Sequence, residues 1–508
     1  MACTSFPPRV RPRDLLIAIG LLCIFLLFTS HWQYPQPPGV SSYSIVATNS
    51  GGAHDFEAQT RFWRALQTLL KDTAPATPSP AMFGHRKTID FDSKHEIHRP
   101  DLLWISKEDV KKLQKAHYDF INGIKAGDPE LDLVYKPGTQ GIVTATGSSD
   151  LPVLVISLRM VRRTDTTLPM EVFLMPGEEY EEAICKDVLP SLNARCIVLT
   201  DILGAEEASK IKQHQLKSLA ILFSSFEDIL WLDSDCFALH DPAQIFRSDL
   251  YRSTGLITWP DSSASTASPL YYEISSQGRV PYLTERASTE AGQIFISKKR
   301  HHLTLLLMSY YNHYGPSHYY PLLSQVDPDE RGEKETFLAA ASALGAPFYA
   351  TTERIRPIGH RKANAANNNG SNKINNIAGS AVVQFDPIRD HQLTSQGKWR
   401  MKNESVAPLP RAFFIHAHNP KFNPATIFDP SENETESPTR GPDGKNTRAW
   451  TAPEETIYSV GYDVEIHFWE DFKWVACDLE FKFKSWKNKW GICEKAMNYW
   501  HSVFDGVQ

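Results

Sequence analysis

Residues 226–236 constrain the fold of this chain more than any other segment, because an uninterrupted apolar run ends there at two carboxylates. Residues 229–232 read Ile-Leu-Trp-Leu, and Asp233 and Asp235 follow. A run this apolar predicts a strand buried on both faces, as in the parallel sheets of α/β folds. Alternation puts both carboxylates on one side of the chain, at the end of the strand where ligands usually bind. The pair therefore predicts a site for a hard divalent cation that bridges to the phosphates of a nucleotide.

The first residues of the chain have the pattern of a membrane signal anchor. Arg9, Arg11 and Arg13 precede an uncharged apolar run over residues 15–28. The bulky residues that follow, among them Trp32, do not form the small-residue site at which a signal peptidase cleaves. We therefore expect an uncleaved anchor whose arginine-rich end stays in the cytosol, although so short an apolar run also fits a cleaved signal peptide.

The remainder of the chain divides by composition. Residues 33–52 and the region around Pro75, Pro78 and Pro80 are poor in residues that can pack, which is typical of a stem. From residue 102 apolar residues recur at helical spacing, and the chain from there to its end is long enough for one large domain. The expected organisation is a cytosolic tail over residues 1–14, a transmembrane signal anchor over 15–32, a stem over 33–101 and a lumenal catalytic domain over 102–508.

Cysteines and glycosylation sequons agree with a lumenal body. Five of the seven cysteines lie beyond the expected anchor, where the compartment is oxidising. Any of them also fits a small buried apolar position. The economical bridges join Cys185 to Cys196 and Cys477 to Cys493, which leaves Cys236 as a free thiol. The sequons predict N-glycosylation at Asn369, Asn403 and Asn433.

Apolar segments of strand length alternate with helical patterns in the body. Such alternation predicts an α/β fold with a Rossmann-type, mixed but mostly parallel sheet flanked by helices. The expected strands cover residues 141–144, 170–174, 194–199 and 229–232; a helix is expected over 206–223, residues 153–160 fit a helix or a strand, and 364–376 and 429–453 read as loops. The net charge of −6 comes from dispersed charges of both signs, which argues against a nucleic-acid partner.

A series of longer motifs occurs in order along residues 138–421. They are Lys217-Ser218-Leu219-Ala220-Ile221, Ser224-Ser225-Phe226-Glu227, Leu232-Asp233-Ser234-Asp235, Asp241-Pro242, Trp259-Pro260-Asp261, Glu290-Ala291-Gly292-Gln293, Gly332-Glu333-Lys334-Glu335-Thr336-Phe337 and His416-Ala417-His418-Asn419-Pro420-Lys421. This series resembles the fungal mannan α-mannosyltransferases and is most similar to their branching α-1,2 type. Two residues depart from the family pattern: Cys236 stands where Asn is common, and Glu333 where Asp is common.

The resemblance implies a fold, a reaction and a location. It implies a GT-A-like fold, GDP-mannose as the donor, and a mannan or N-glycan outer-chain acceptor on cell-wall glycoproteins. It also implies a retaining reaction that depends on Mn²⁺, with Mg²⁺ as the alternative ion. The chain would then be a type II protein of the Golgi membrane, with other mannosyltransferases as further partners.

Metal ligands are expected at the acid pair and at one late histidine. Asp235 is the first candidate for a direct ligand, and Asp233 either ligates the ion or holds the donor ribose. The resemblance implies that His416 or His418 completes the metal shell; alternation puts both on one side of the chain, so spacing does not separate them, and His416 is favoured. Taken alone, two acids spaced two apart are usually a solvated turn, but the apolar run over residues 229–232 favours a buried strand that ends where the acids begin.

Other residues are expected to contact the two substrates. Lys217 and Arg159 could face donor phosphate or cap a surface, and the turn at residues 141–144 could cradle guanosine or be purely structural. Aromatic residues could stack on sugar or belong to the core, and acids at a helix start are often caps. The donor set is Gly141, Val143, Thr144, Arg159, Lys217, Ser234 and Lys421; the acceptor set is Trp259, Asp261, Gln293 and Lys334; Glu290 and Glu335 join Asp233 and Asp235 as catalytic candidates, with contacts to mannose hydroxyls.

Three other functions remain compatible with parts of the sequence. A sister enzyme would form α-1,3 linkages, because linkage depends on the shape of acceptor loops. A lumenal glycan-binding or scaffold subunit would have lost its site, against which the intact acids argue. A glycoside hydrolase needs two carboxylates on opposite sides of the scissile bond, which adjacent acids such as Asp233 and Asp235 do not supply.

Overall fold

The computed structural model describes residues 56–84, 88–174, 180–326, 331–361, 377–429, 437–441 and 443–506. The expected tail and anchor, and the sequons at Asn369 and Asn433, lie outside these residues. In the part of the chain that is described, no helix combines the length and the apolar composition that a bilayer span requires. The described residues from Phe56 onward form one compact unit.

A seven-stranded sheet is the centre of this unit. Its order is β10-β8-β9-β6-β3-β4-β5, and β9 runs antiparallel to its neighbours β6 and β8 while the other pairs are parallel. The strands are β3 (Lys136–Thr146), β4 (Met170–Leu174), β5 (Ala194–Val198), β6 (Phe226–Leu232), β8 (Leu256–Ala264), β9 (Ala287–Ser297) and β10 (Tyr349–Ala350). The mixed, mostly parallel, GT-A-like sheet expected from the sequence is thereby confirmed.

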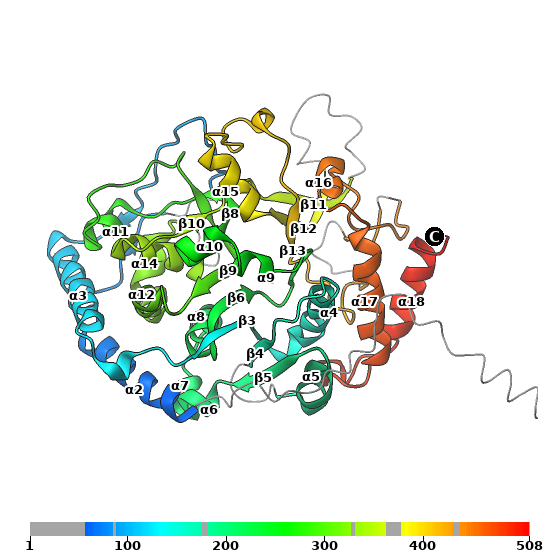
Figure 1. The fold of residues 1–508 in the computed structure, drawn as a ribbon, viewed down its shortest axis with the longest axis horizontal. Coiled ribbons are helices and arrows are strands. Elements are labelled where there is room, and N and C mark those ends of the chain that lie inside the picture. The colour runs from blue at the N-terminus through cyan, green and yellow to red at the C-terminus, as the bar shows by residue number, and fades with distance from the viewer. Residues whose placement is uncertain are drawn as a thin grey trace, which may run out of the picture. The chain divides into compact units, whose positions relative to one another are not determined.

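Side chains of the central strands alternate between two buried layers, as a period of two requires. Ile229 and Trp231 of β6 pack into one layer, whereas Leu230 and Leu232 pack into the other. Figure 1 shows α3, α12 and α14 on one side of the sheet and α4, α17 and α18 on the opposite side. These helices are α3 (Lys107–Lys125), α4 (Leu151–Arg162), α12 (His302–His313), α14 (Thr336–Leu344), α17 (Val464–Asp478) and α18 (Ile492–Val503).

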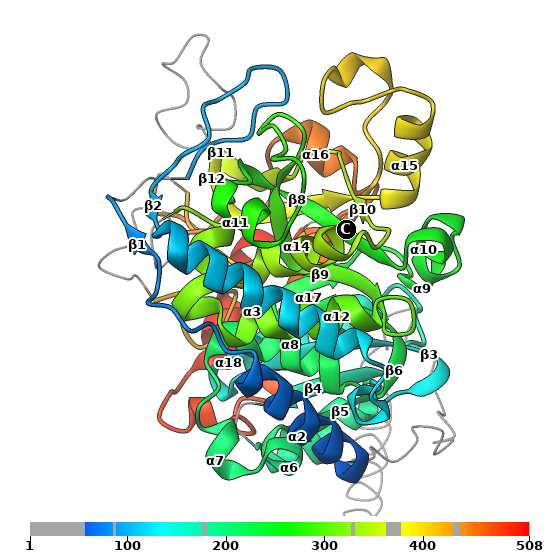
Figure 2. The same ribbon diagram turned by 90° about the vertical axis from the view of Figure 1, so that its left-hand side faces the viewer.

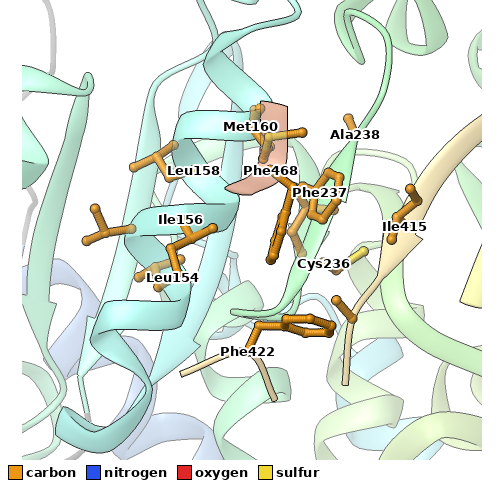
Figure 3. Close-up of a cluster of buried hydrophobic side chains, with 14 of the residues drawn as sticks. Leu154, Ile156, Leu158, Met160, Cys236, Phe237, Ala238, Ile415, Phe422 and Phe468 are labelled. Carbon is orange, nitrogen blue, oxygen red and sulfur yellow. The ribbon is translucent and has the colours of Figure 1, made fainter. Parts of the chain in front are cut away.

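A second, antiparallel sheet begins directly after the acid pair. Its order is β11-β12-β13-β7, with β7 (Cys236–Ala238) continuing the chain from β6, and with β11 (Arg356–Arg361), β12 (Ile377–Phe385) and β13 (Ala412–His416). In the β13–β7 register His416 lies opposite Cys236. Figure 3 shows Phe237 and Ile415 of this sheet in an apolar cluster with Phe468 of α17 and the side chains of α4. The late histidine motif is therefore held next to the acids by strand pairing and by a buried core.

Part of the expected stem belongs to the folded body. Helix α2 (Phe56–Asp72) buries Phe62, Trp63 and Leu66, and the first two rings make edge contacts with Phe223. The side-chain amide of Gln59 donates to the carbonyl of Phe223. Figure 2 shows α2 and α3 together along the same side of the molecule. Helical spacing placed the expected start of the body at residue 102, because the packing partners of α2 lie far along the chain and leave no local signal.

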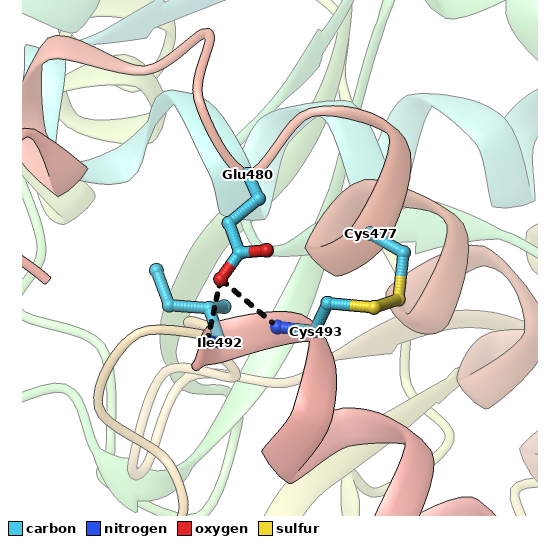
Figure 4. The surroundings of a disulfide bond; sticks show 4 residues. All are labelled: Cys477, Glu480, Ile492 and Cys493. Atoms are coloured by element: carbon cyan, nitrogen blue, oxygen red, sulfur yellow. Dashed lines mark hydrogen bonds between the residues drawn. A yellow bond between two sulfur atoms is a disulfide. The ribbon is translucent and has the colours of Figure 1, made fainter. Parts of the chain in front are cut away.

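Two disulfides close local loops in the body. Cys185 joins Cys196, and Cys477 joins Cys493 at the facing ends of α17 and α18. Figure 4 shows Glu480 beside the second bridge, where its carboxylate accepts hydrogen bonds from the first backbone N–H groups of α18. Cys236 is a buried free thiol in β7. These are the pairings that economy of loop length predicted.

Among the remaining elements, the structure decides one open alternative and changes one prediction. Residues 153–160, which fitted a helix or a strand, lie in α4. The helix expected over 206–223 is two helices, α7 (Ala205–Ala208) and α8 (Gln213–Phe223), with a turn between them. The other elements are α5 (Leu189–Ser191), α6 (Thr200–Leu203), α9 (Ala243–Phe246), α10 (Asp249–Thr254), α11 (Pro269–Ile274), α13 (Tyr320–Leu323), α15 (Pro387–Ser395), α16 (Glu454–Tyr458), and the small hairpin of β1 (Ala81–Met82) and β2 (Leu103–Trp104).

Candidate active site

A cavity of about 310 Å³ opens at the carboxyl ends of β3 and β6. This is the edge of an α/β sheet where ligands usually bind. Its walls come from the end of β3 and the turn after it, the start of α8, the acid turn, the turn before α14, and the segment after β13. The lining residues are Ala145, Thr146, Gly147, Asp150, His214, Leu216, Lys217, Trp231, Asp233, Ser234, Asp235, Glu333, His416 and Lys421.

The acid pair and one late histidine meet in this cavity. Nε2 of His416 lies 2.9 Å from Oδ1 of Asp235 and 4.0 Å from Oδ2 of Asp233. One ligand atom from each of the three residues falls within 4.8 Å of the others. The backbone fixes this arrangement, because Asp233 N donates to Gly292 O and Ala417 N donates to Asp235 O. Two carboxylates and an imidazole are a donor set that suits Mn²⁺ and also admits Mg²⁺, so these residues fit the expected ion.

The geometry separates the two histidines that spacing left open. His416 is buried and faces the acids, whereas His418 is exposed and its Nδ1 lies 3.2 Å from the carbonyl of His416. Burial alone would lower the pKa of His416, but Asp235 and Glu290 raise it well above its usual value. Burial alone would raise the pKa of Asp235, yet His416 and Lys421 hold it well below its usual value. In this structure the cluster is therefore held together by opposite charges.

Lys217 is bonded to the acidic residues of the cavity and is therefore not free to bind a phosphate. Its Nζ lies 3.2 Å from Asp233 Oδ1 and 3.0 Å from Glu333 Oε1, and it donates to the carbonyl of Ala291 at 2.7 Å. Trp231 Nε1 donates to the same Asp233 oxygen at 2.8 Å. Although burial raises the pKa of Glu333, Lys217 and His214 lower it to about 2. Lys217 thus neutralises two cavity carboxylates at once.

Lys421 closes the other side of the cavity. Its Nζ lies 2.7 Å from Oδ2 of Asp150 and 3.5 Å from Oδ2 of Asp235. Asn423 donates to the carbonyl of Ser149 at 3.0 Å and so joins the same two segments. The Lys421 side chain is 40% exposed, against 9% for Lys217. Of the two lysines, Lys421 is the one with room to exchange a carboxylate for a phosphate.

Four members of the expected donor set do not reach the cavity. Gly141 lies against the ring of Phe226, where a Cβ would be 2.2 Å from a ring carbon. Val143 and Thr144 are fully buried inside β3. Arg159 points to the far side of α4, where it pairs with Asp471 at 2.9 Å and lies over the Trp474 ring. The donor role expected for these four residues is wrong, because they lie before the end of β3 or on the outer face of α4.

The residues expected to contact the acceptor or the transferred sugar have other partners in the structure. Trp259 is buried and its Nε1 donates to the carbonyl of Phe385 at 2.9 Å, so a stacking role is wrong. Lys334 pairs with Asp261 at 2.7 Å, outside the cavity lining. Glu335 is buried, accepts from the backbone of Thr289 and pairs with Arg286 at 2.7 Å. Glu335 therefore braces the segment before α14, and its side chain does not line the cavity.

Glu290 and Gln293 lie behind the acid cluster. Glu290 Oε1 lies 3.0 Å from Nδ1 of His416, and Gln293 donates to Glu290 Oε2 at 2.7 Å. Neither side chain lines the cavity. Although burial raises the pKa of Glu290, His416 lowers it to about 2. Glu290 thus contacts His416 directly, and Gln293 holds Glu290 in place.

Several residues that line the cavity were not among the site residues predicted from the sequence. Thr146, Gly147 and Asp150 line the cavity just after the strand expected at residues 141–144, and their signal is their place beyond the end of that strand. Glu333 also lines the cavity, and its signal is its place in the motif over residues 332–337. His214 carries no sequence signal, because its place depends on where α8 begins.

Two solved glycosyltransferases align with parts of the structure. The galactosyltransferase LgtC, solved with donor and acceptor sugar analogues, covers 42% of this chain and 73% of its own, with 15% identity and a TM-score of 0.28. The glycosyltransferase GlyE of Streptococcus pneumoniae covers 66% of this chain and 63% of its own, with 11% identity and a TM-score of 0.31. Both scores lie below 0.5, so the fold rests on the strand order and directions given above.

Sequence relatives give a closer match. The family model described as "Mannosyltransferase putative" matches residues 139–287 and 279–386. "Alpha-1,2-mannosyltransferase MNN21" of Candida albicans is 30% identical, over 80% of this chain and 67% of the relative. "Alpha-1,2-mannosyltransferase MNN5" of Saccharomyces cerevisiae is 26% identical over 97% of both. "Alpha-1,2-mannosyltransferase MNN2" of Saccharomyces cerevisiae is 31% identical, over 73% of this chain and 68% of the relative. With these matches and the acid cluster at its sheet edge, the chain belongs to the fungal α-1,2-mannosyltransferase family and is an α-mannosyltransferase.

Proposed function

We propose that this chain transfers mannose from GDP-mannose to mannan side chains of glycoproteins, forms an α-1,2 linkage with retention of configuration, and requires Mn²⁺ or Mg²⁺. The observation that carries the proposal is the meeting of Asp233, Asp235 and His416 in one cavity at the carboxyl ends of β3 and β6. The α-1,2-mannosyltransferase activity for which the relatives are named supports the α-1,2 linkage.

The three residues would hold the ion and leave the rest of the cavity to the donor. Bound there, a divalent ion would stabilise the negative charge of the departing diphosphate. Lys421, within 3.5 Å of Asp235 and partly exposed, would pair with a diphosphate oxygen. Lys217 keeps Asp233 and Glu333 in place from behind. These side chains thus bind and orient the donor before transfer.

We propose that no protein side chain acts as the general base. Glu335, expected from the sequence to touch mannose, is bound by Arg286, and Glu290 is bound by His416. We propose that the departing diphosphate takes the proton of the attacking hydroxyl, since it lies on the same face of the sugar in a retaining transfer. The chain then has only to hold the two substrates close together.

We propose further that the enzyme is a type II protein of the Golgi membrane, with its catalytic body in the lumen and a mannan or N-glycan outer chain as acceptor. The arginine-flanked apolar run at residues 15–28 and the sequons support this placement. Two disulfides in the body fit an oxidising compartment.

The test is transfer by the full-length chain in detergent, with GDP-mannose and an α-1,6-mannooligosaccharide, and with Mn²⁺ or a chelator. A metal-dependent product with an α-1,2 linkage is expected. Asp235→Asn should abolish transfer, whereas Asp249→Asn, whose side chain is fully exposed, should not affect it. An α-1,3 product would overturn the proposed α-1,2 linkage. Full activity of Asp235→Asn, or full activity of the wild type in chelator, would overturn the proposed metal-dependent mechanism. Absence of both transfer and GDP binding would indicate a non-catalytic subunit.

A further inference from the structure

Each of the two ring nitrogens of His416 lies within hydrogen-bond distance of a carboxylate. Nε2 faces Oδ1 of Asp235 at 2.9 Å, and Nδ1 faces Oε1 of Glu290 at 3.0 Å. The three side chains come from β13, from the turn after β6 and from β9. Only the Nε2 side of the ring faces the acid pair. The Glu290 contact therefore lies on the side of the imidazole away from the candidate metal site.

Glu290 is itself held so that it cannot turn into the cavity. Its Oε1 accepts the backbone N–H of Gly292 at 2.8 Å, and its Oε2 accepts from Gln293 at 2.7 Å. The side-chain amide oxygen of Gln293 in turn accepts a hydrogen bond from the thiol of Cys236 at 3.4 Å. The side chain of Glu290 is 13% exposed. A carboxylate with each oxygen already bonded is suited to orient a neighbour rather than to react.

Gly292 makes room for the contact between Glu290 and His416. A Cβ at this position would lie 2.5 Å from Nδ1 of His416 and 2.9 Å from Oε1 of Glu290. The carbonyl of the same residue accepts the backbone N–H of Asp233 at 2.8 Å. One short segment of β9 therefore braces both the histidine and the acid turn, and any side chain at residue 292 would displace them.

We propose that Glu290 is a positioning residue, which holds the proton of His416 on Nδ1 and so directs the Nε2 lone pair to the metal site formed with Asp233 and Asp235. This inference rests on the proposed metal dependence. A histidine that binds a metal through one ring nitrogen commonly donates its other N–H to a carboxylate, which fixes the tautomer and the ring orientation. The alternative is that Glu290 only neutralises a buried cation and does not affect the ion.

Metal affinity of the full-length chain distinguishes these two roles. The dissociation constant of Mn²⁺ is measured by titration calorimetry in the presence of GDP, for the wild type, Glu290→Ala and Glu290→Gln. Glu290→Ala should weaken binding about 10- to 100-fold, the usual effect of losing such a partner. Glu290→Gln should weaken it less, because the amide oxygen can still accept the proton on Nδ1. Electron spin echo spectra should show imidazole nitrogen coupled to Mn²⁺ in the wild type, a weaker signal in Glu290→Ala and no signal in His416→Ala.

A matched control separates positioning from general damage to the fold. Glu353 is another buried carboxylate, paired with Arg400 rather than with His416, and Glu353→Gln should leave the affinity for Mn²⁺ and the nitrogen signal unchanged. Wild-type affinity and an undiminished nitrogen signal in Glu290→Ala would overturn the inference alone. Absence of Mn²⁺ binding by the wild type would overturn the proposed metal dependence and this inference with it. If Glu290→Ala does not fold, Glu290→Leu decides, because leucine fills similar space without an acceptor, and wild-type affinity and signal there would overturn the positioning role.

Discussion

At the scale of single residues, the cavity is a set of charges that already satisfy one another. Its four carboxylates each lie close to a basic nitrogen: Asp150 at 2.7 Å from Lys421, Asp233 at 3.2 Å and Glu333 at 3.0 Å from Lys217, and Asp235 at 2.9 Å from His416. Buried charges are tolerated only when they are paired in this way. A metal and a diphosphate would have to exchange partners within this set, and the more exposed pair of Lys421 and Asp150 is the easiest to open.

Removing Lys217 should destabilise the protein, because it leaves Asp233 and Glu333 without their shared cation. We expect Lys217→Met to lower the free energy of unfolding by about 3 kcal/mol, the lower end for breaking a buried ion pair, since Asp233 is 29% exposed. The double variant Lys217→Met/Glu333→Gln should recover about 1 kcal/mol of this loss, because it removes one uncompensated charge. Unfolding in urea measures both values.

Lys210→Met is the matched control for this prediction. Its side chain is 57% exposed and pairs with Glu206 and Glu207 at the surface. Such a pair contributes little, so the change should stay within about 0.5 kcal/mol. Equal losses for Lys210→Met and Lys217→Met, or no recovery in the double variant, would contradict the role given to Lys217.

His117 should make the stability of the protein depend on pH. Burial in α3 lowers the pKa of His117 to about 4, and its Nε2 lies 2.8 Å from the hydroxyl of Tyr311. An unfolded histidine has a pKa of about 6.5, so between these values the unfolded state binds the extra proton and stability falls as the pH falls. From pH 7 to pH 5 the contribution of His117 to the free energy of unfolding should drop by about 2 kcal/mol. Urea unfolding at both pH values measures this loss, and His117→Gln should show a correspondingly smaller pH dependence; an identical dependence would contradict the prediction.

At the scale of elements, the sequence predicted what local pattern determines. The apolar run at residues 229–232 predicted β6 and placed the acids at its end, because a strand buried on both faces has few other readings. Prediction from the sequence failed where the packing partner of a residue lies far along the chain. Trp259 was a candidate for stacking on the acceptor sugar, but its neighbours in β9 and β12 make it a core residue. Likewise α2 lies in the expected stem, because no local pattern reveals that Phe223 of α8 supplies its packing partner.

Truncating a side chain of α2 should therefore destabilise the catalytic body. Leu66 is fully buried in the same apolar cluster as Phe120 and Phe223. Leu66→Ala should lower the free energy of unfolding by about 2 to 5 kcal/mol, through lost apolar contact and the cavity left behind. Arg64→Ala, two residues away on the exposed face of the helix, should change it by less than about 0.5 kcal/mol. Urea unfolding measures both variants, and equal stability of the two would show that α2 does not belong to the folded body.

At the scale of the whole molecule, the site exists because two sheets meet at the acid turn. The chain leaves the large sheet at β6, passes Asp233 and Asp235, and enters the small sheet at β7. Pairing of β13 with β7 then brings His416 to Asp235 across a sequence separation of 181 residues. The sequence supplied both halves of this site as motifs, but their contact depends on a strand register that no local pattern contains. For the same reason His416 and His418 could be separated only in the structure.

Because its residues come from both sheets, the site should stabilise the whole molecule when it is filled. A ligand that binds only the folded state raises the free energy of unfolding by about 2.7 kcal/mol at 100 times its dissociation constant. We expect Mn²⁺ and GDP together at that concentration to raise the unfolding temperature of the full-length chain, measured by scanning calorimetry. Asp235→Asn should lose the increase, whereas Asp249→Asn, on the exposed surface of α10, should keep it. If Asp235→Asn gained as much stability as the wild type, the ligands would bind elsewhere, and the junction of the two sheets would not be the metal and donor site.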